Sequence, residues 1–319
     1  MSLRAELVRL GSRLFLKPRN SPAITIAQRR ERTARFEGWV PMPPSGTEVA
    51  REELGGVPAL RVATPQSCAH RHILFLHGGG YVSGSPQLYR HITWRFAAAA
   101  GARVAAIAYR LAPEHPFPAA IDDAVAAWRG HLDRGADPRR TAIIGESAGG
   151  GLALALGLRL RDAGAPLPAA IVALSPWTDL ALSGASLHRN AAADPMQNTA
   201  DVPYLAGLYL AGADPHNPYA SPLYGDPTGL PPSLIQVGGD EILLDDALRM
   251  AERMRKAGCE VALEIWPRMP HFWHAFAPLI PESCRAIARV GAFIAERTAE
   301  GRQTLMPCSG ARPPSAAAK

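Results

Sequence analysis

The sequence predicts an α/β fold in which a mostly parallel central sheet is flanked by helices and carries a helical cap. Between about residues 55 and 177, short apolar runs alternate with helical segments, which is the pattern of the strand–helix–strand units of a parallel sheet. Hydrophobic residues make up 47% of the 319-residue chain, enough to fill a sizeable core. Because α/β folds often exceed the usual domain size, we expect one large α/β domain with a smaller added part.

The N-terminal segment, residues 1–50, is expected to form part of the cap. Within residues 1–19, apolar side chains recur at helical spacing and basic side chains lie mostly on other faces, which predicts an amphipathic helix. The apolar residues are Leu3, Leu7, Leu10 and Leu14, and the basic ones are Arg9, Arg13 and Lys17. Since the apolar stripe of a short helix must pack on something, we expect it to help roof a pocket. A basic amphipathic helix can also lie on a membrane surface, and that alternative stays open.

The α/β domain itself is expected over residues 51–300, with one insertion. The alternating pattern breaks after about residue 179 and resumes near residue 221. Residues 180–220 are therefore predicted to be an inserted helical piece of the cap. Residues 301–319 are rich in Gly, Pro, Ser and Ala, a composition typical of a disordered tail.

A sharp turn with a serine at its apex is predicted at residues 145–149, which read Gly-Glu-Ser-Ala-Gly. The apolar run at residues 142–144 precedes it as a short buried strand, and a helix-like run follows it. A strand, a G-x-S-x-G turn and a helix in this order form a nucleophile elbow, which exposes the serine hydroxyl. Side chains at Gly145 or Gly149 would collide with neighbouring strands. Ser147 is therefore the candidate nucleophile.

A second glycine-rich turn, His-Gly-Gly-Gly at residues 77–80, follows another predicted strand at residues 72–76. Acyl transfer needs backbone N–H donors aimed at the oxygen that becomes negative in the tetrahedral intermediate, and consecutive glycines let the backbone aim them. The sequence patterns of phosphate-binding loops are absent. We expect an oxyanion hole made by the N–H groups of Gly79, Gly80 and Ala148. His77 is expected to orient the loop.

A catalytic serine needs a histidine base, and the base needs a carboxylate that orients it. In this type of fold the acid follows the serine in sequence and the histidine comes last, each in a loop after a strand. Four acidic residues follow the predicted strand at residues 233–237: Asp240, Glu241, Asp245 and Asp246. We expect Asp240 to be the orienting acid because it comes first after the strand. Asp245 and Asp246 fall where a helix starts and suit its N-terminal dipole.

The histidine base is expected in the loop after the β-rich run at residues 261–266. That loop contains His271, and His274 follows three residues later. The loop position favours His271 as the base, and His274 is expected on a helix face. Glu146, next to the candidate nucleophile, is expected to be a structural acid tied to nearby loops rather than a catalytic group.

In this order the motifs resemble those of the hormone-sensitive lipase family of α/β-hydrolases, over about residues 73–276. Besides the two glycine-rich turns, the resemblance includes Tyr-Arg-Leu-Ala-Pro-Glu-His-Pro-Phe-Pro-Ala-Ala at 109–120, Ala-Ser-Pro-Leu at 220–223, Gly-Gly-Asp-Glu-Ile-Leu-Leu-Asp-Asp at 238–246 and Met-Pro-His at 269–271. The commoner family members have Asp or Thr in place of Glu146. The motifs at 241–246 and 269–274 are similar to those of the branch that includes monoterpene ε-lactone hydrolases and some short-chain carboxylesterases.

The resemblance implies an α/β-hydrolase fold, an N-terminal cap segment, and a serine carboxylic-ester hydrolase that needs no metal or cofactor. The expected substrates are small-molecule esters with short to medium acyl chains, of about six carbons or fewer in an enclosed pocket. Lactone hydrolysis with the same triad is the alternative within this chemistry. A small-molecule receptor is the alternative of another class, because some relatives that have lost the histidine serve as receptors.

Composition argues against several other classes of protein. The net charge of +6 is concentrated at the chain ends, and residues 1–35 alone hold nine basic residues against two acidic ones, so no nucleic-acid-binding face is expected. No run reaches the ~18 apolar residues of a membrane span, and the start lacks the apolar core of a signal peptide. The four cysteines lie far apart, which predicts free thiols in a cytoplasmic protein. They are Cys68, Cys259, Cys284 and Cys308. A homodimer is left open.

Overall fold

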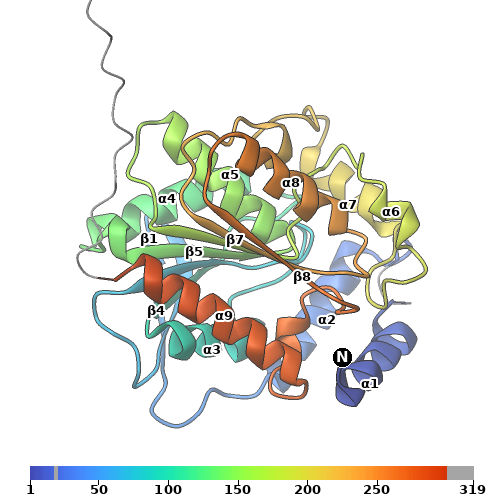
Figure 1. Ribbon diagram of the computed structural model, residues 1–319, viewed down its shortest axis with the longest axis horizontal. Coiled ribbons are helices and arrows are strands. Elements are labelled where there is room, and N and C mark those ends of the chain that lie inside the picture. The colour runs from blue at the N-terminus through green and yellow to red at the C-terminus, as the bar shows by residue number, and fades with distance from the viewer. Residues whose placement is uncertain (18–20, 300–319) are drawn as a thin grey trace, which may run out of the picture.

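The computed structural model describes residues 1–17 and 21–299, and an eight-stranded sheet forms the centre of this part of the chain (Figure 1). The strand order is β1-β2-β4-β3-β5-β6-β7-β8. The strands are β1 (Glu48–Leu54), β2 (Val57–Ala63), β3 (His72–Leu76), β4 (Arg103–Ile107), β5 (Thr141–Glu146), β6 (Ala170–Leu174), β7 (Ser233–Gly238) and β8 (Val261–Trp266). Both the tail predicted for residues 301–319 and Cys308 lie outside the described residues.

The sheet is mostly parallel, as predicted. Strands β4, β3, β5, β6, β7 and β8 pair in parallel, whereas β2 pairs antiparallel with both β1 and β4. Every residue of β5, β6 and β7 is buried. Because these central strands are covered on both faces, they are continuous apolar runs in the sequence rather than alternating ones.

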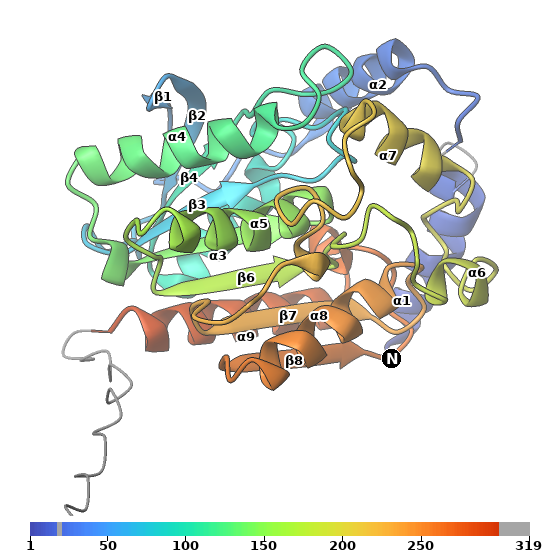
Figure 2. The same ribbon diagram turned by 90° about the horizontal axis from the view of Figure 1, so that it is seen from above.

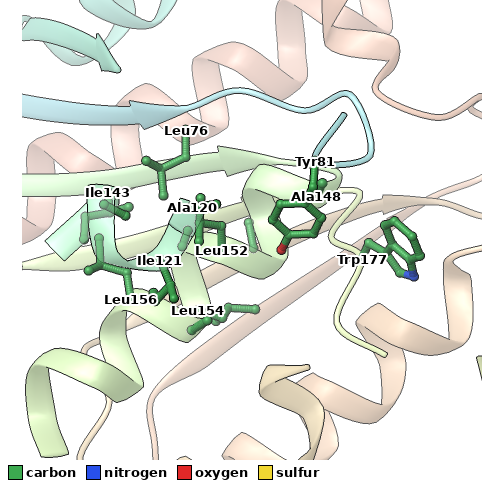
Figure 3. Packing of buried hydrophobic residues seen from close by; sticks show 14 of the residues in the cluster. Leu76, Tyr81, Ala120, Ile121, Ile143, Ala148, Leu152, Leu154, Leu156 and Trp177 are labelled. Atoms are coloured by element: carbon green, nitrogen blue, oxygen red, sulfur yellow. The ribbon is translucent and has the colours of Figure 1, made fainter. Parts of the chain in front are cut away.

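Helices cover both faces of the sheet (Figure 1). On one face lie α3 (Arg90–Ala100) and α9 (Pro281–Arg297), and on the other lie α4 (Ala119–Asp133), α5 (Ala148–Asp162) and α8 (Leu244–Lys256). Alternate residues of a strand point to opposite faces. Leu74 and Leu76 of β3 therefore join the core under α4 and α5, while Phe75 joins the core under α3 and α9. In the close view of the first core, Leu152 of α5 lies beside Ala120 and Ile121 of α4 (Figure 3).

The remaining helices lie beyond the carboxyl ends of the parallel strands (Figure 2). They are α1 (Leu3–Gly11), which continues as a π-helical turn η1 (Ser12–Leu16), then α2 (Ile26–Trp39), α6 (Ser186–Arg189) and α7 (Asp201–Leu210). Short 3₁₀ helices also occur in the described residues at η3 (Pro138–Arg140), η4 (Pro222–Tyr224) and η5 (Trp273–Phe276). The guanidinium of Arg29 in α2 donates to the Asp201 carboxylate of α7 at 2.9 Å. Two segments far apart in the sequence are thereby joined above the sheet.

The N-terminal helix forms where it was predicted, but its apolar stripe points outward. Leu3, Leu7, Leu10 and Leu14 are 77%, 62%, 55% and 58% exposed. The helix is held by its other face: Ala5 and Val8 pack against an apolar cluster around Trp273. Polar contacts add to this, since Ser2 donates through N–H and Oγ to Glu282, and Arg9 pairs with Asp240 at 2.7 Å. The expectation that the leucine stripe packs against the rest of the chain is therefore wrong, because the face that carries Ala5, Val8 and Arg9 makes the attachment.

Two further expectations concern the membrane and the cysteines. Within residues 1–17 and 21–299, none of the helices combines the length and the apolar character that crossing a bilayer requires. Cys68, Cys259 and Cys284 are free thiols. The predicted free state of the cysteines is confirmed for these three.

Candidate active site

Ser147 sits at the apex of a tight turn between β5 and α5, as the nucleophile-elbow pattern predicts. Its backbone adopts φ 55° and ψ −120°, a conformation rarely found for a residue with a side chain. Steric crowding requires glycine at both flanking positions. A Cβ on Gly145 would lie 1.9 Å from the Gly149 carbonyl oxygen, and one on Gly149 would lie 2.2 Å from the Leu76 carbonyl oxygen. The small residues let the elbow pass close to its own helix and to β3.

His271 follows β8 and is 4% exposed. Its Nδ1 lies 2.8 Å from Oε2 of Glu241, a carboxylate that is fully buried. The other oxygen of Glu241 accepts hydrogen bonds from Ser175 Oγ at 2.7 Å and from the Gly238 N–H at 2.6 Å. The carboxylate is thus fixed by the ends of β6 and β7 and holds the imidazole in one orientation.

The prediction that Asp240 orients the histidine is corrected by this geometry. The Asp240 side chain points the other way and pairs with Arg9 of α1 at 2.7 Å. In the turn after β7, the two neighbouring side chains leave the backbone on different sides, and that of Glu241 turns inward. The other two acids are also engaged elsewhere: Asp245 binds Ser186 and Arg189, and Asp246 accepts from the N–H groups of Thr178 and Asp179.

Glu146 lies on the other side of the imidazole. Its Oε1 is 3.3 Å from His271 Nε2, and its Oε2 accepts a hydrogen bond from the Tyr89 hydroxyl at 2.6 Å. The same hydroxyl accepts from the Gly78 N–H at 3.2 Å. A Cβ on Gly78 would approach Glu146 Oε2 to 1.9 Å. Glu146 therefore links the elbow strand, the histidine and the glycine-rich loop.

The two carboxylates determine the charge of the imidazole. Burial alone would lower the pKa of His271, but hydrogen bonds to Glu146 and Glu241 and the charges of both groups outweigh it and raise the pKa to about 10. Burial raises the pKa of Glu241, although His271 counters that effect. The two buried acids therefore favour the protonated form of His271, and the neutral form needed of a base gains population as the pH rises.

The glycine-rich loop bends beside the elbow with its backbone in glycine-type conformations. Gly79 has φ 114° and Gly80 has φ 63°, and a Cβ on Gly79 would lie 2.2 Å from the Ser83 carbonyl oxygen. Ala148 is the first residue of α5, where the N–H groups have no acceptor within the helix. The N–H donors expected to form the oxyanion hole thus belong to a loop and a helix start that meet at Ser147.

His77 and His274 are both buried and lie outside the catalytic pocket. The ring of His77 stacks on Tyr109 with centroids 4.3 Å apart, and its Nδ1 lies 2.8 Å from the Gly78 carbonyl oxygen. Burial lowers its pKa to about 4. His274, expected on a helix face, instead lies in the 3₁₀ turn η5 with its Nε2 at 2.7 Å from Gln236, and burial lowers its pKa to about 3.

A pocket of about 360 Å³ opens onto Ser147 and His271. Its floor is the elbow and the glycine-rich loop, and its walls include Arg29 of α2 and apolar side chains of α7 such as Leu205. Both α2 and the 180–220 insertion therefore reach the pocket, whereas α1 contributes no lining residue. Within the described residues, no group of three His, Cys, Asp or Glu side chains is arranged to hold a metal ion.

The fold and this site define the class of protein: an α/β-hydrolase with a serine at its nucleophile elbow. The α/β-hydrolase-fold family model matches residues 73–275. An acetyl-hydrolase from Streptomyces hygroscopicus is 49% identical over 79% of this chain and 88% of its own length. A putative acetyl-hydrolase of Mycobacterium tuberculosis, LipR, is 36% identical over 92% of this chain and 94% of its own.

Solved structures agree with these relatives. An esterase of the bacterial hormone-sensitive lipase family superposes with a TM-score of 0.87 at 44% identity, over 94% of this chain and 99% of that one. The esterase EstE5, in a crystal soaked with p-nitrophenyl butyrate, superposes with a TM-score of 0.88 at 39% identity, over 93% and 99% of the two chains. The chain belongs to the hormone-sensitive lipase family of α/β-hydrolases, and it is an enzyme of the carboxylesterase class. The resemblance noted from the sequence is thereby confirmed.

Proposed function

We propose that this enzyme hydrolyses small carboxylic esters with short to medium acyl chains through a Ser147–His271–Glu241 triad. The observation that carries the proposal is the contact between His271 Nδ1 and the buried Glu241 carboxylate, beside a serine held at a strained elbow. Relative to the sequence-based expectation, Ser147 and His271 keep their roles and Glu241 takes the role of Asp240.

In the proposed reaction, Ser147 Oγ attacks the ester carbonyl carbon while neutral His271 takes the hydroxyl proton at Nε2. The carbonyl oxygen becomes negative and is held by the N–H groups of Gly79, Gly80 and Ala148. Removing one such donor costs roughly 3–4 kcal/mol in other enzymes. The tetrahedral intermediate collapses, His271 returns the proton to the leaving alkoxide, and an acyl-enzyme remains.

Water then enters as the second nucleophile. His271 accepts a proton from the water, hydroxide adds to the acyl carbonyl, and collapse releases the acid and restores the Ser147 hydroxyl. Throughout, Glu241 keeps the proton of the imidazole on Nδ1 and stabilises the imidazolium that forms in each half-reaction. His77, stacked on Tyr109 and bonded to Gly78, orients the loop that carries Gly79 and Gly80.

The size of the pocket supports a preference for small substrates. A volume of about 360 Å³ lies near the lower end of the range for ligand pockets. The pocket is walled by α2 and α7, so we propose that residues 1–50 and 180–220 together act as the cap of a catalytic domain at 51–300. Acyl chains of about six carbons or fewer fit such a pocket better than long ones. EstE5, the relative soaked with p-nitrophenyl butyrate, received a four-carbon acyl ester.

Lactones are the second substrate class, because a compact cyclic ester also suits a small pocket and needs the same attack at a carbonyl carbon. The deciding experiment is a panel of p-nitrophenyl acetate, butyrate, hexanoate and laurate together with monoterpene lactones. We expect turnover to peak at six carbons or fewer. A peak at laurate would contradict the size argument, and faster turnover of a lactone than of any linear ester would establish the lactonase alternative.

The triad itself is tested by covalent labelling. A fluorophosphonate reagent should label the protein at Ser147, and peptide mass spectrometry locates the adduct. Chelators should leave the ester turnover unchanged. Labelling at a different serine, or inhibition by EDTA that zinc reverses, would contradict the proposed chemistry.

A further inference from the structure

A second pocket lies at the opposite end of the sheet from Ser147, where β3 and β4 begin. Its volume is about 490 Å³, and it is enclosed by β1, β2, the first residues of β3 and β4, and the last turn of α4. These elements meet on the side of the sheet away from the cap (Figure 2). The charged and imidazole side chains that line it are Arg51, Glu52, Arg61, His72, Arg103, His131 and Arg134. We call it the amino-end pocket.

The lining of the amino-end pocket carries a surplus of positive charge. Arg61 pairs with Glu48 at 2.7 Å, and Arg134 reaches Glu52 only at 3.7 Å. Among the described residues, no carboxylate lies within ion-pair distance of Arg51 or Arg103. Strand alternation places Arg61 and Arg103 on the α4 face of the sheet together with Glu48 and Glu52, whereas Arg51 points to the opposite face. Arg61 also reaches Glu52 at 3.8 Å, so Arg103 is the arginine on this face without a carboxylate partner among the described residues. An unpaired guanidinium at a pocket wall attracts an oxyanion.

His131 adds a buried polar group without a partner. The residue is 7% exposed and lines the amino-end pocket, and its Nε2 has no hydrogen-bond partner. Its ring packs edge-on against that of His72, with centroids 4.9 Å apart. A buried polar atom without a partner costs free energy. Burial and the neighbouring cations lower the pKa of both histidines, and an anion among them would oppose the effect of the cations.

We propose that the amino-end pocket binds the phosphoryl group of a small metabolite, held by Arg103 and Arg134 with an N–H of His131. Guanidinium groups present planar pairs of donors that match phosphoryl oxygens, and charge-assisted hydrogen bonds of this kind are about twice as strong as neutral ones.

The volume and the lining of the pocket also leave room for the rest of the metabolite. A volume of 490 Å³ exceeds what one phosphate ion fills, and Leu54, Val104 and Ala105 supply an apolar part of the lining. This site does not depend on the triad, since it lies at the other end of the strands.

The test is a binding titration on the full chain at constant ionic strength. Isothermal titration calorimetry measures the affinity for inorganic phosphate, pyrophosphate, glucose 6-phosphate and AMP. Glucose and adenosine, which lack the phosphoryl group, are titrated for comparison. We expect one saturable site for phosphorylated ligands, with a Kd below about 1 mM, and a rise in Tm on saturation. Tighter binding of an organic phosphate than of free phosphate would identify the metabolite as the source of the group, and equal binding would identify the free ion.

Variants then locate the site. The double variant Arg103→Gln/Arg134→Gln should weaken binding at least tenfold, by the loss of two charge-assisted contacts. Arg255→Gln, on the exposed face of α8, is the matched control and should bind like the parent protein. Histidine NMR signals of His72 and His131 should shift on ligand addition while that of His271 stays in place. The proposal is overturned by the absence of saturable binding up to ~10 mM, or by equal weakening in Arg255→Gln.

Discussion

The two ends of the central sheet place buried histidines in opposite electrostatic surroundings. At the carboxyl end His271 is 4% exposed, and at the amino end His131 is 7% exposed. Burial acts to lower the pKa of both. Two carboxylates overcome it at the carboxyl end and raise the pKa of His271 to about 10, whereas His72 and Arg134 add to it at the amino end and leave the pKa of His131 at about 4.

The difference shows that burial keeps a histidine neutral unless neighbouring carboxylates outweigh it, as they do at His271. The acids at the carboxyl end come from strand ends and the loops after them, where Glu146 ends β5 and Glu241 follows β7. The arginines of the amino end sit at strand starts and on the β1–β2 hairpin. Catalytic groups and the proposed anion site thus occupy opposite ends of the same strands.

The strongest test of the carboxyl end is Ser147→Ala. Without the hydroxyl no acyl-enzyme can form, so kcat for p-nitrophenyl butyrate should fall by about 10⁶, the loss measured for a comparable triad serine. Because the change removes one oxygen at the pocket floor, the melting temperature should stay close to that of the parent protein. A variant that keeps a tenth of the activity would contradict the assignment of Ser147.

The second test compares two adjacent acids. Glu241→Gln should lower kcat by about 10⁴, as loss of the orienting carboxylate does in a well-studied triad, because the imidazole takes the wrong tautomer. Asp240→Asn is the matched control, since this residue pairs with Arg9 rather than with His271. Its kcat should change by less than about threefold, in keeping with an ion pair near the surface. A larger loss in Asp240→Asn would restore the original prediction.

These two acids also show which parts of the site can be predicted from the sequence. The order of motifs correctly places Ser147, His271 and the acid in their loops, because strand order and loop position follow from hydrophobic pattern. Which of two neighbouring acids turns inward depends on the turn after β7 and on hydrogen bonds from Ser175 and Gly238. Those contacts join residues from different strands, so no local pattern reveals them.

The same limit applies to the N-terminal helix and to the amino-end pocket. Spacing predicts a helix with a leucine stripe, but the direction of the stripe is set by Glu282 and Asp240, which are distant in the sequence. The arginines of the amino-end pocket come from β1, β2, β4 and the end of α4. They form a cluster only once the sheet order is known.

A third test removes one of the two charges beside His271. His271 acts as a base only when neutral, so activity should rise with pH as the imidazolium loses its proton, and a pKa of about 10 carries that rise into the alkaline range. Glu146→Gln keeps the size of the side chain and removes its charge. The pKa of His271 should fall, and the acidic limb of kcat/KM should move to lower pH by about one unit or more.

The pH profile separates this electrostatic role of Glu146 from a structural one. A structural role alone would lower kcat/KM equally at every pH and leave the midpoint of the limb in place. Glu252→Gln, on the exposed part of α8, serves as the control and should leave the midpoint unchanged. If the limb of Glu146→Gln moves to higher pH, the contact at His271 Nε2 does not stabilise the imidazolium.

The smallest expected effects belong to α1, which attaches to the carboxyl end through Ala5, ion pairs and hydrogen bonds while its leucine stripe faces outward. Leu7 is 62% exposed, so Leu7→Gln should change the free energy of unfolding by less than about 0.5 kcal/mol. Arg9→Gln removes the contact with Asp240 and should cost up to about 1 kcal/mol, with kcat nearly unchanged because His271 bonds to Glu241 instead. Urea unfolding measures both variants. A larger cost for Leu7→Gln than for Arg9→Gln would mean that the leucine stripe is covered in solution, and that the face carrying Ala5 and Arg9 is not the one that holds this helix at the catalytic end of the sheet.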